Sequence, residues 1–325
     1  MVYPVHYSPF TVHWFMCLIL FAHQAHRNYP LILAANRDEA YARPAAPAAF
    51  WDDHPQIYGG RDLEKGGTWL GLTRCGRMAA VTNYRNRNAG RTAPLSRGAL
   101  VSGFLTSDSD TETYLERVKA QGGQYNGFIL IAGDLEALYW LSNRGPGVAR
   151  IPPGVHGLSN HLLNTPWPKI KRSKQAMEAL LLSIEEMPDN AHPSSPTLLP
   201  GGEGRFAAQM DCHPFMQNSI SAGEAELAAK LFELLSDRSE APDDELPDTG
   251  VGLQRERELS PIFINGDRYG TRASTVMLVD KDGDVLYIER GFGAGGKPLG
   301  EVATRFRLEN LTSSTMPGDQ AAVRA

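Results

Sequence analysis

The sequence contains few cysteines and none of the short motifs that bind metals. Its three cysteines, Cys17, Cys75 and Cys212, are odd in number and widely spaced, which excludes a disulfide framework and the paired ligands of a structural zinc site. No HExxH or CxxC motif occurs in the 325 residues. We therefore expect no metal and no other cofactor, and a reducing, cytoplasmic location.

The chain also lacks a block of basic residues. Its 32 Lys and Arg are outnumbered by 37 Asp and Glu, which gives a net charge of −5. This balance offers no electrostatic basis for binding nucleic acid or an anionic membrane. We expect neither as a partner.

A long hydrophobic run is missing too. The apolar segment at residues 12–22 is much too short to span a bilayer, and no Lys or Arg precedes it as in a signal peptide. We expect no transmembrane segment. The simpler interpretation is that residues 1–15 are an extension, or a mis-called start, ahead of a true start at Met16.

The overall composition is that of a globular protein. Hydrophobic residues make up 42% of the chain and charged residues 21%, which is typical of a domain with a sizeable core. We expect one domain over residues 16–309. The polar composition of residues 310–325 predicts a disordered tail.

Short apolar runs separated by turn residues predict a β-rich fold. Residues 18–21 and 31–35 predict a β-hairpin with Cys17 at its open end, followed by the tetrad Asn36-Arg37-Asp38-Glu39. Two further strands end in an asparagine, Asn83 or Asn160. Other strands are expected at residues 126–132, 137–141, 274–280, 285–290 and 302–308, and irregular chain at the Pro- and Ala-rich residues 41–51.

Helices are expected in two pairs along the chain. Residues 98–105 and 111–121 form the first pair, and a helix from Pro168 and one at 222–235 form the second. In the helix that Pro168 opens, apolar residues recur at helical spacing and predict core contacts. Its basic residues Lys169, Lys171, Arg172 and Lys174 are expected to be solvent-exposed.

The run Gly291-Phe-Gly-Ala-Gly-Gly-Lys297 matches part of a phosphate-binding loop. However, Pro298 stands where a Ser or Thr should bind magnesium, and a strand rather than a helix follows. Without a helix N-terminus there is no dipole to hold a phosphate. We interpret the run as a hairpin loop.

The Met16-Cys17 pair suggests a nucleophile. Removal of Met16 would leave Cys17 with both a thiol, of pKa about 8.5, and an α-amine, of pKa about 8, so the amine could accept the thiol proton near neutral pH. The alternative is an ordinary half-buried strand cysteine. Asn83 and Asn160 could supply the uncharged donors of an oxyanion hole, or could simply cap turns.

Motifs spread along the chain resemble the NRDE family, also called the transport and Golgi organisation family. They are Met16-Cys17, Asn36-Arg37-Asp38-Glu39, Gly66-Gly67-Thr68-Trp69-Leu70-Gly71, Val81-Thr82-Asn83-Tyr84-Arg85, Gly157-Leu158-Ser159-Asn160, Thr165-Pro166-Trp167-Pro168-Lys169 and Tyr269-Gly270-Thr271-Arg272. The resemblance runs from Met16 to about Glu301. It implies an α+β fold of the N-terminal-nucleophile (Ntn) hydrolase type, a four-layer αββα sandwich with two antiparallel sheets between helical layers.

The resemblance also implies roles for charged residues. Amidases that share this fold place an Arg and an Asp near the nucleophile, so Asp38 would hold the α-ammonium or the substrate nitrogen and Arg37 would lower the thiol pKa. Arg272 would lie near the nucleophile. The alternatives are structural ion pairs, and which of Asn36, Arg37 and Asp38 faces the thiol stays open.

Two functions follow from the resemblance. The first is a cysteine-nucleophile amidohydrolase that acts on a small-molecule amide or acyl bond. The second is a non-catalytic protein that handles haem or a lipid or acyl ligand, because the family has been linked with haem trafficking, lipid metabolism and secretory-pathway organisation.

Overall fold

Two antiparallel β-sheets packed face to face form the centre of the protein in a computed structural model, which describes residues 16–85, 93–185 and 220–309. In spatial order, the first sheet contains β10 (Gly154–Leu158), β1 (Leu18–His23), β2 (Leu31–Ala40), β11 (Tyr269–Val279), β12 (Asp284–Phe292) and β13 (Pro298–Arg307). The second contains β3 (Ala45–Phe50), β4 (Ile57–Asp62), β5 (Leu70–Thr73), β6 (Met78–Asn83), β7 (Phe128–Gly133), β8 (Leu138–Ser142) and β9 (Ala149–Arg150).

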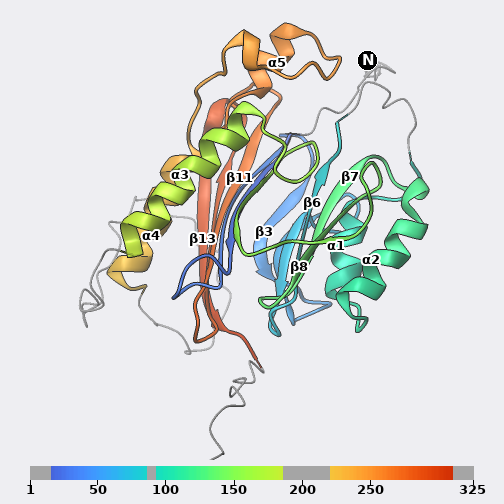
Figure 1. Ribbon diagram of the computed structural model, residues 1–325, viewed down its shortest axis with the longest axis vertical. Helices are drawn as coiled ribbons and strands as arrows, with labels where there is room; N and C mark the ends of the chain where they lie inside the picture. The colour runs from blue at the N-terminus through green and yellow to red at the C-terminus, as the bar shows by residue number, and fades with distance from the viewer. Residues whose placement is uncertain (1–15, 86–92, 186–219, 310–325) are drawn as a thin grey trace, which may run out of the picture.

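Helices cover the outer face of each sheet. On the first sheet lie α3 (Pro168–Glu185) and α4 (Ala222–Leu235), and on the second lie α1 (Gly98–Leu105) and α2 (Thr111–Ala120). Figure 1 shows the four layers from the side, with α5 (Leu253–Leu259) at one end of the sandwich. Short 3-10 turns occur at η1 (Gly122–Gln124), η3 (Asp243–Glu245) and η4 (Ala294–Gly296). The expected αββα sandwich of two antiparallel sheets is confirmed.

The central strands are buried on both faces, which explains their imperfect polar–apolar alternation. In β2, Leu33 and Ala35 pack between the two sheets, while Ile32 and Ala34 pack under the helices. Side chains alternate between the faces of a strand. The two residues that follow, Asn36 and Arg37, must therefore point in opposite directions.

The strand β3 was not expected. Residues 41–51 were predicted to be irregular, but Ala45–Phe50 forms β3 at the edge of the second sheet. Its pairing with β4 shifts register between Ala46 and Ala49. A proline is tolerated at such a bulge on an edge strand because no second neighbour needs its missing N–H, and Pro47 lies there.

The prediction that Lys169 is solvent-exposed is wrong. Only 2% of this residue is exposed, whereas Lys171 on the same helix is exposed as expected. Lys169 lies one helical turn before the fully buried Ser173 and therefore shares its inward face. The buried face of α3 therefore includes polar residues such as Lys169 and Ser173 in addition to the predicted stripe of apolar residues.

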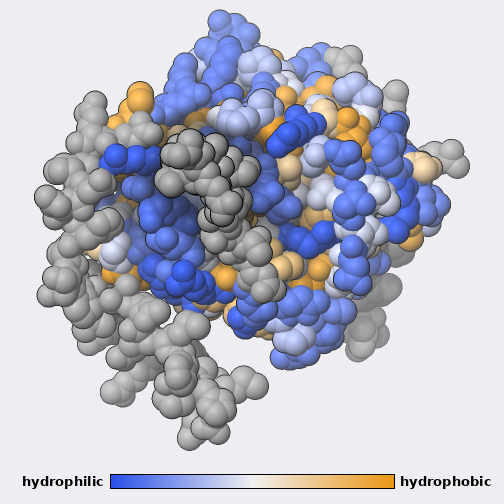
Figure 2. Space-filling model, turned by 60° about the horizontal axis from the view of Figure 1, so that its bottom comes forward, coloured by the Kyte–Doolittle hydropathy of each residue, from blue (hydrophilic) through white to orange (hydrophobic). Residues whose placement is uncertain are grey.

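Three remaining features of the fold concern the loop after β12, the helices and the molecular surface. The loop between β12 and β13 contains residues 293–297 and joins the two strands as a hairpin, as predicted, while Gly291 and Phe292 are the last residues of β12. Within the described ranges, no helix has the length and apolar character needed to cross a bilayer. Figure 2 shows a mostly hydrophilic face with hydrophobic residues scattered over it. Residues 1–15 and 310–325, for which an extension and a disordered tail were predicted, lie outside the described residues.

Candidate active site

Cys17 lies immediately before β1, at the strand end where it was expected. The residues after it pair with both neighbouring strands, Leu18 with Asn36 of β2 and Ile19 with Leu158 of β10. The carbonyl oxygen of Cys17 accepts a hydrogen bond from Ser159 Oγ at 2.9 Å. Two strands and this hydroxyl therefore hold the backbone on which the thiol is carried.

A cavity of about 700 Å³ lies beside Cys17, between the two sheets. All but one of the six predicted site residues line it: Cys17, Arg37, Asp38, Asn83 and Arg272. They come from β2, β6 and β11 as well as from the start of β1. The sandwich thus brings residues separated by up to 255 positions to one cavity.

Asn160 is the exception. It is fully buried, its Nδ2 donates to the backbone oxygen of Asn83 at 3.0 Å, and its Oδ1 accepts from Ser159 Oγ at 3.1 Å. Asn160 is not among the described residues that line the cavity. It supports the strand end that carries Asn83, and its role as an oxyanion donor stays a prediction.

The tetrad Asn36-Arg37-Asp38-Glu39 lies within β2, and its side chains point to both faces of that strand. Asn36 points under the helices, where its Nδ2 donates to the carbonyl oxygens of Leu235 and Ile262, both at 2.9 Å. Its Oδ1 accepts from Ser274 Oγ at 2.6 Å. Arg37 points the other way and lines the cavity. Asn36 is therefore structural, and the question left open by the sequence is settled against it.

We expect Asn36→Ala to lower the free energy of unfolding by about 3 kcal/mol, because it leaves three buried polar partners unsatisfied. Urea unfolding followed by circular dichroism measures this change. Ser274→Ala is the graded control, since it removes one of the three bonds and should cost about 1 kcal/mol. Equal stabilities for Asn36→Ala and the parent would contradict this account.

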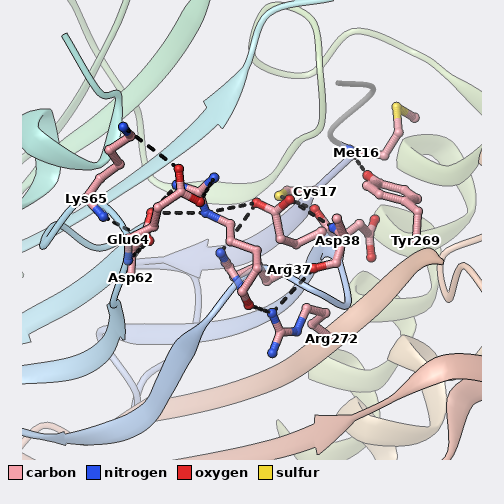
Figure 3. A network of polar contacts seen from close by, with 12 residues as sticks. Met16, Cys17, Arg37, Asp38, Asp62, Glu64, Lys65, Tyr269 and Arg272 are labelled. Atoms are coloured by element: carbon pink, nitrogen blue, oxygen red, sulfur yellow. Dashed lines mark hydrogen bonds and ion pairs between the residues drawn. The ribbon is translucent and has the colours of Figure 1, made fainter. Parts of the chain in front are cut away.

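A row of arginines and carboxylates extends from Arg37 along the cavity wall. Arg37 Nη2 lies 3.5 Å from Glu39 Oε2, and Arg43 joins Glu39 at 3.7 Å to Asp62 at 2.6 Å. Arg272 donates to the backbone oxygens of Ala40 and Arg43. In Figure 3 Asp62 lies on one side of Cys17, with Met16 and Tyr269 on the other.

The thiol itself is buried, and this decides its ionisation. Burial raises the pKa of Cys17 to about 12, and the negative charge of Asp38 adds to the increase. Arg37 lowers the thiol pKa as expected, but its effect is smaller. While Met16 remains attached, Cys17 is a neutral thiol. The low pKa was expected for the chain that begins at Cys17 and stays a prediction.

Asp38 is buried next to the thiol. Its Oδ1 accepts from Thr271 Oγ1 at 2.6 Å, and its backbone oxygen lies 3.9 Å from Cys17 Sγ. Burial raises the pKa of this carboxyl to about 7, although Lys169 and the Thr271 hydrogen bond both lower it. Burial thus favours the neutral form of Asp38, while Lys169 and Thr271 favour the ionised form.

Two contacts of Met16, and an ion pair next to them, were missed from the sequence. The backbone N–H of Met16 donates to the hydroxyl of Tyr269, and Arg85 Nη1 lies 3.4 Å from Met16 Sδ. Arg85 also forms a buried ion pair with Glu256 at 3.2 Å. Arg85 and Tyr269 belong to the motifs that resemble the family, so the sequence did contain a signal that these two residues matter. No sequence feature pointed to Glu256.

Arg97 is a further cavity residue that was missed. It precedes α1 and donates from Nη1 to the backbone oxygen of Gly127 at 3.2 Å. Burial lowers its pKa to about 10, and the charges of Cys17 and Glu39 oppose that effect. No group of three or more potential metal-binding side chains occurs among the described residues.

Comparison with known proteins shows the family. A family model described as Transport and Golgi organisation 2 matches residues 16–197 and 205–294. The chain is similar to the Transport and Golgi organization protein 2 homolog of Bos taurus, with 36% identity over 318 residues that cover 91% of this chain and 100% of the relative. It is also similar to Transport and Golgi organization protein 2 of Drosophila melanogaster, at 29% identity over 88% of this chain and 95% of the relative.

Two solved structures are similar at low sequence identity. One is a mutant conjugated bile acid hydrolase from Clostridium perfringens, with a TM-score of 0.38 and 9% identity, covering 90% of this chain and 92% of that chain. The other is the Caenorhabditis elegans ortholog of N-acylethanolamine-hydrolyzing acid amidase, with a TM-score of 0.37 and 13% identity, covering 81% and 92%. The family model and the relatives together establish that this chain belongs to the Transport and Golgi organisation 2 family.

Proposed function

We propose that the chain beginning at Cys17 is an Ntn-type hydrolase that cleaves an amide or related acyl bond of a small molecule. The observation that carries the proposal is the position of Cys17 at a strand end, on the wall of a cavity that Arg37, Asp38, Asn83 and Arg272 also line. A free thiol at this place suits a reducing, cytoplasmic compartment.

The proposed reaction needs no cofactor. The α-amine of Cys17 takes the thiol proton, and the thiolate attacks the substrate carbonyl carbon. The side-chain amide of Asn83 is the candidate donor to the oxyanion. The carbon–nitrogen bond then breaks, the leaving amine takes the proton from the α-ammonium, and water hydrolyses the thioester to release the acid and restore the thiol.

This chemistry requires that residue 17 become the first residue. We expect protein isolated from its natural source to begin at Cys17, because an attached Met16 converts the required amine into a peptide nitrogen. Intact mass and N-terminal sequencing measure the start directly. Finding Met1 on the native protein would contradict the prediction and remove the base from the mechanism.

Activity is tested with the Cys17-initiated protein and a panel of N-acyl amides of increasing acyl length, each carrying a chromogenic amine. We expect release of the amine together with an acyl-protein adduct of matching mass after rapid acid quench. Absence of both, across acyl chains and across pH 5 to 9, would reject the hydrolase proposal.

A non-catalytic ligand carrier is the second candidate. It is favoured by the neutral state of the Cys17 thiol in the chain that retains Met16 and by the apolar part of the cavity wall, which includes Trp69, Val81 and Leu299. Haem or an acyl lipid would then occupy the same cavity. Saturable binding of either one, without turnover by the Cys17-initiated protein, would favour this candidate.

A further inference from the structure

A second buried group of charges lies around the start of β1. It contains Lys169 at the start of α3 and Asp38 of β2, which are 2% and 1% exposed. In the described part of the chain, neither Lys169 Nζ nor Asp38 Oδ2 has a hydrogen-bond partner. A buried ammonium without such a partner is costly to a fold, so its presence calls for an explanation beyond packing.

The two groups act on each other and on Cys17. Lys169 is the strongest of the charges that favour ionised Asp38, and Asp38 is the strongest of those that favour charged Lys169. The charge of Lys169 also interacts with Cys17. Burial lowers the pKa of Lys169 to about 8 and raises that of Asp38 to about 7.

The α-amine of a mature Cys17 would belong to this group. Its nitrogen is the peptide nitrogen that now joins Cys17 to Met16, and Met16 is itself buried here among Leu259, Ile264 and Tyr269. Cleavage of the Met16–Cys17 bond therefore creates a new titratable nitrogen on the residue whose thiol lies 3.9 Å from the Asp38 backbone oxygen and interacts with the charge of Lys169. An adjacent positive charge lowers the pKa of an amine, and an adjacent negative charge raises it.

We propose that Lys169 is the positioning residue for the α-amine of mature Cys17: its buried ammonium disfavours a second positive charge there and so keeps the amine in the neutral form that accepts the thiol proton. The inference rests on the proposed function, because that function requires the neutral amine. It assigns to Lys169 a role that neither its motif nor its place on a helix indicated.

The elements that pack around the start of β1 contribute other charged or titratable groups near the α-amine of mature Cys17. They are Arg37 and Glu39 of β2, Arg85 after β6, Arg97 before α1, Arg172 of α3, Glu256 of α5 and Tyr269 of β11. Arg37 is ion-paired with Glu39 and Arg85 with Glu256, and burial keeps Tyr269 neutral by raising its pKa well above the usual value. Lys169 and Asp38 differ from these groups in that each is the strongest charge acting on the other and neither has a hydrogen-bond partner for its Nζ or Oδ2 among the described residues.

The test measures the amine directly and uses no substrate. Protein starting at Cys17, which retains every described strand and helix, is released from a fusion by a protease that leaves no extra residue. It is labelled with ¹³C-cysteine, and the Cα shift of Cys17 is followed by NMR against pH. We expect Lys169→Met to raise the pKa of the α-amine by about one pH unit or more, because the repulsion is removed while Asp38 remains.

Three variants separate charge from structure. Lys169→Arg keeps the charge and should leave the amine pKa near that of the parent, and Asp38→Asn should lower it. Lys171→Met, on the exposed face of the same helix, should change nothing. Should Lys169→Met fold poorly, the double variant Lys169→Met/Asp38→Asn removes both buried charges and should return the amine pKa toward the parent value.

An unchanged amine pKa in Lys169→Met, or equal changes in Lys169→Met and Lys169→Arg, would overturn the proposal. The result is independent of turnover. If the amine titrates as expected but no amide is cleaved, the hydrolase proposal fails and the role of Lys169 stands. If amides are cleaved while Lys169→Met leaves the amine unaffected, only the role of Lys169 fails.

Discussion

Replacing Cys17 by serine should reduce amide hydrolysis by the mature protein by at least about 10³-fold, because a hydroxyl is a far weaker nucleophile than a thiol when the only base is an α-amine. The substitution changes one buried atom and leaves the backbone contacts of residue 17 in place, including the hydrogen bond from Ser159. The fold and the cavity should therefore persist. The measurement is kcat/KM for the best N-acyl amide, together with the affinity for the same amide by calorimetry.

Cys75→Ser is the matched control, since Cys75 is an exposed cysteine outside the cavity and its replacement should leave kcat/KM unchanged. Retention of more than about a tenth of the parent rate in Cys17→Ser would exclude the thiol as nucleophile. Haem or lipid binding, if it occurs in this cavity, should survive the substitution, which distinguishes the two candidate functions.

Release of Cys17 from Met16 should increase its rate of alkylation by iodoacetamide about 10³-fold at pH 7.5. In the chain that retains Met16, burial raises the thiol pKa to about 12, and the thiolate, which is the reactive form, is then extremely rare. Cleavage opens one side of the residue and adds an amine. Because Arg37 acts on the thiol and Arg272 lines the same cavity, the thiol of the mature chain should saturate in its reaction below about pH 7.5, against a free-thiol pKa near 8.5.

The pH dependence of the alkylation rate shows whether the pKa of the Cys17 thiol is lowered or raised. A lowered thiol pKa makes alkylation fast at neutral pH and flat above it, whereas a raised pKa makes the rate climb through the whole alkaline range. Mass spectrometry of the tryptic peptides follows each cysteine separately, with Cys75 and Cys212 as internal references. A Cys17 that titrates at or above the free-thiol value in both forms of the protein would favour the ligand carrier over the enzyme.

Most of the sequence-based account of the site depended on where strands end. Cys17 and Asn83 were assigned to strand ends, and both occur there on the cavity wall. Asn160 was assigned in the same way, but it lies behind Asn83 and bonds to its backbone. Position along a strand could be inferred from local pattern, while direction relative to a cavity depends on the neighbouring strands and on turns of the chain that the pattern does not describe.

The tetrad illustrates the same limit at the scale of one residue. Its four polar residues looked equivalent in the sequence, yet alternation along β2 sends Asn36 to the helix layer and Arg37 to the cavity. The register of β2 between β1 and β11 decides which is which. A shift by one residue would have exchanged their roles.

The sequence by itself determined the layered α+β architecture, the pairing of helices around it, the hairpin that presents Cys17 and the family to which the chain belongs. Those features follow from local hydrophobic period, from turn residues and from motifs in a recognisable order. Only the tertiary structure decided that Lys169 is buried and that the thiol and Asp38 have raised pKa values. The reason is physical: the free energy of ionising a group depends on the water it has lost and on charges brought near it, and here these come from residues such as Lys169 and Thr271 that lie more than a hundred positions from Cys17 in the chain.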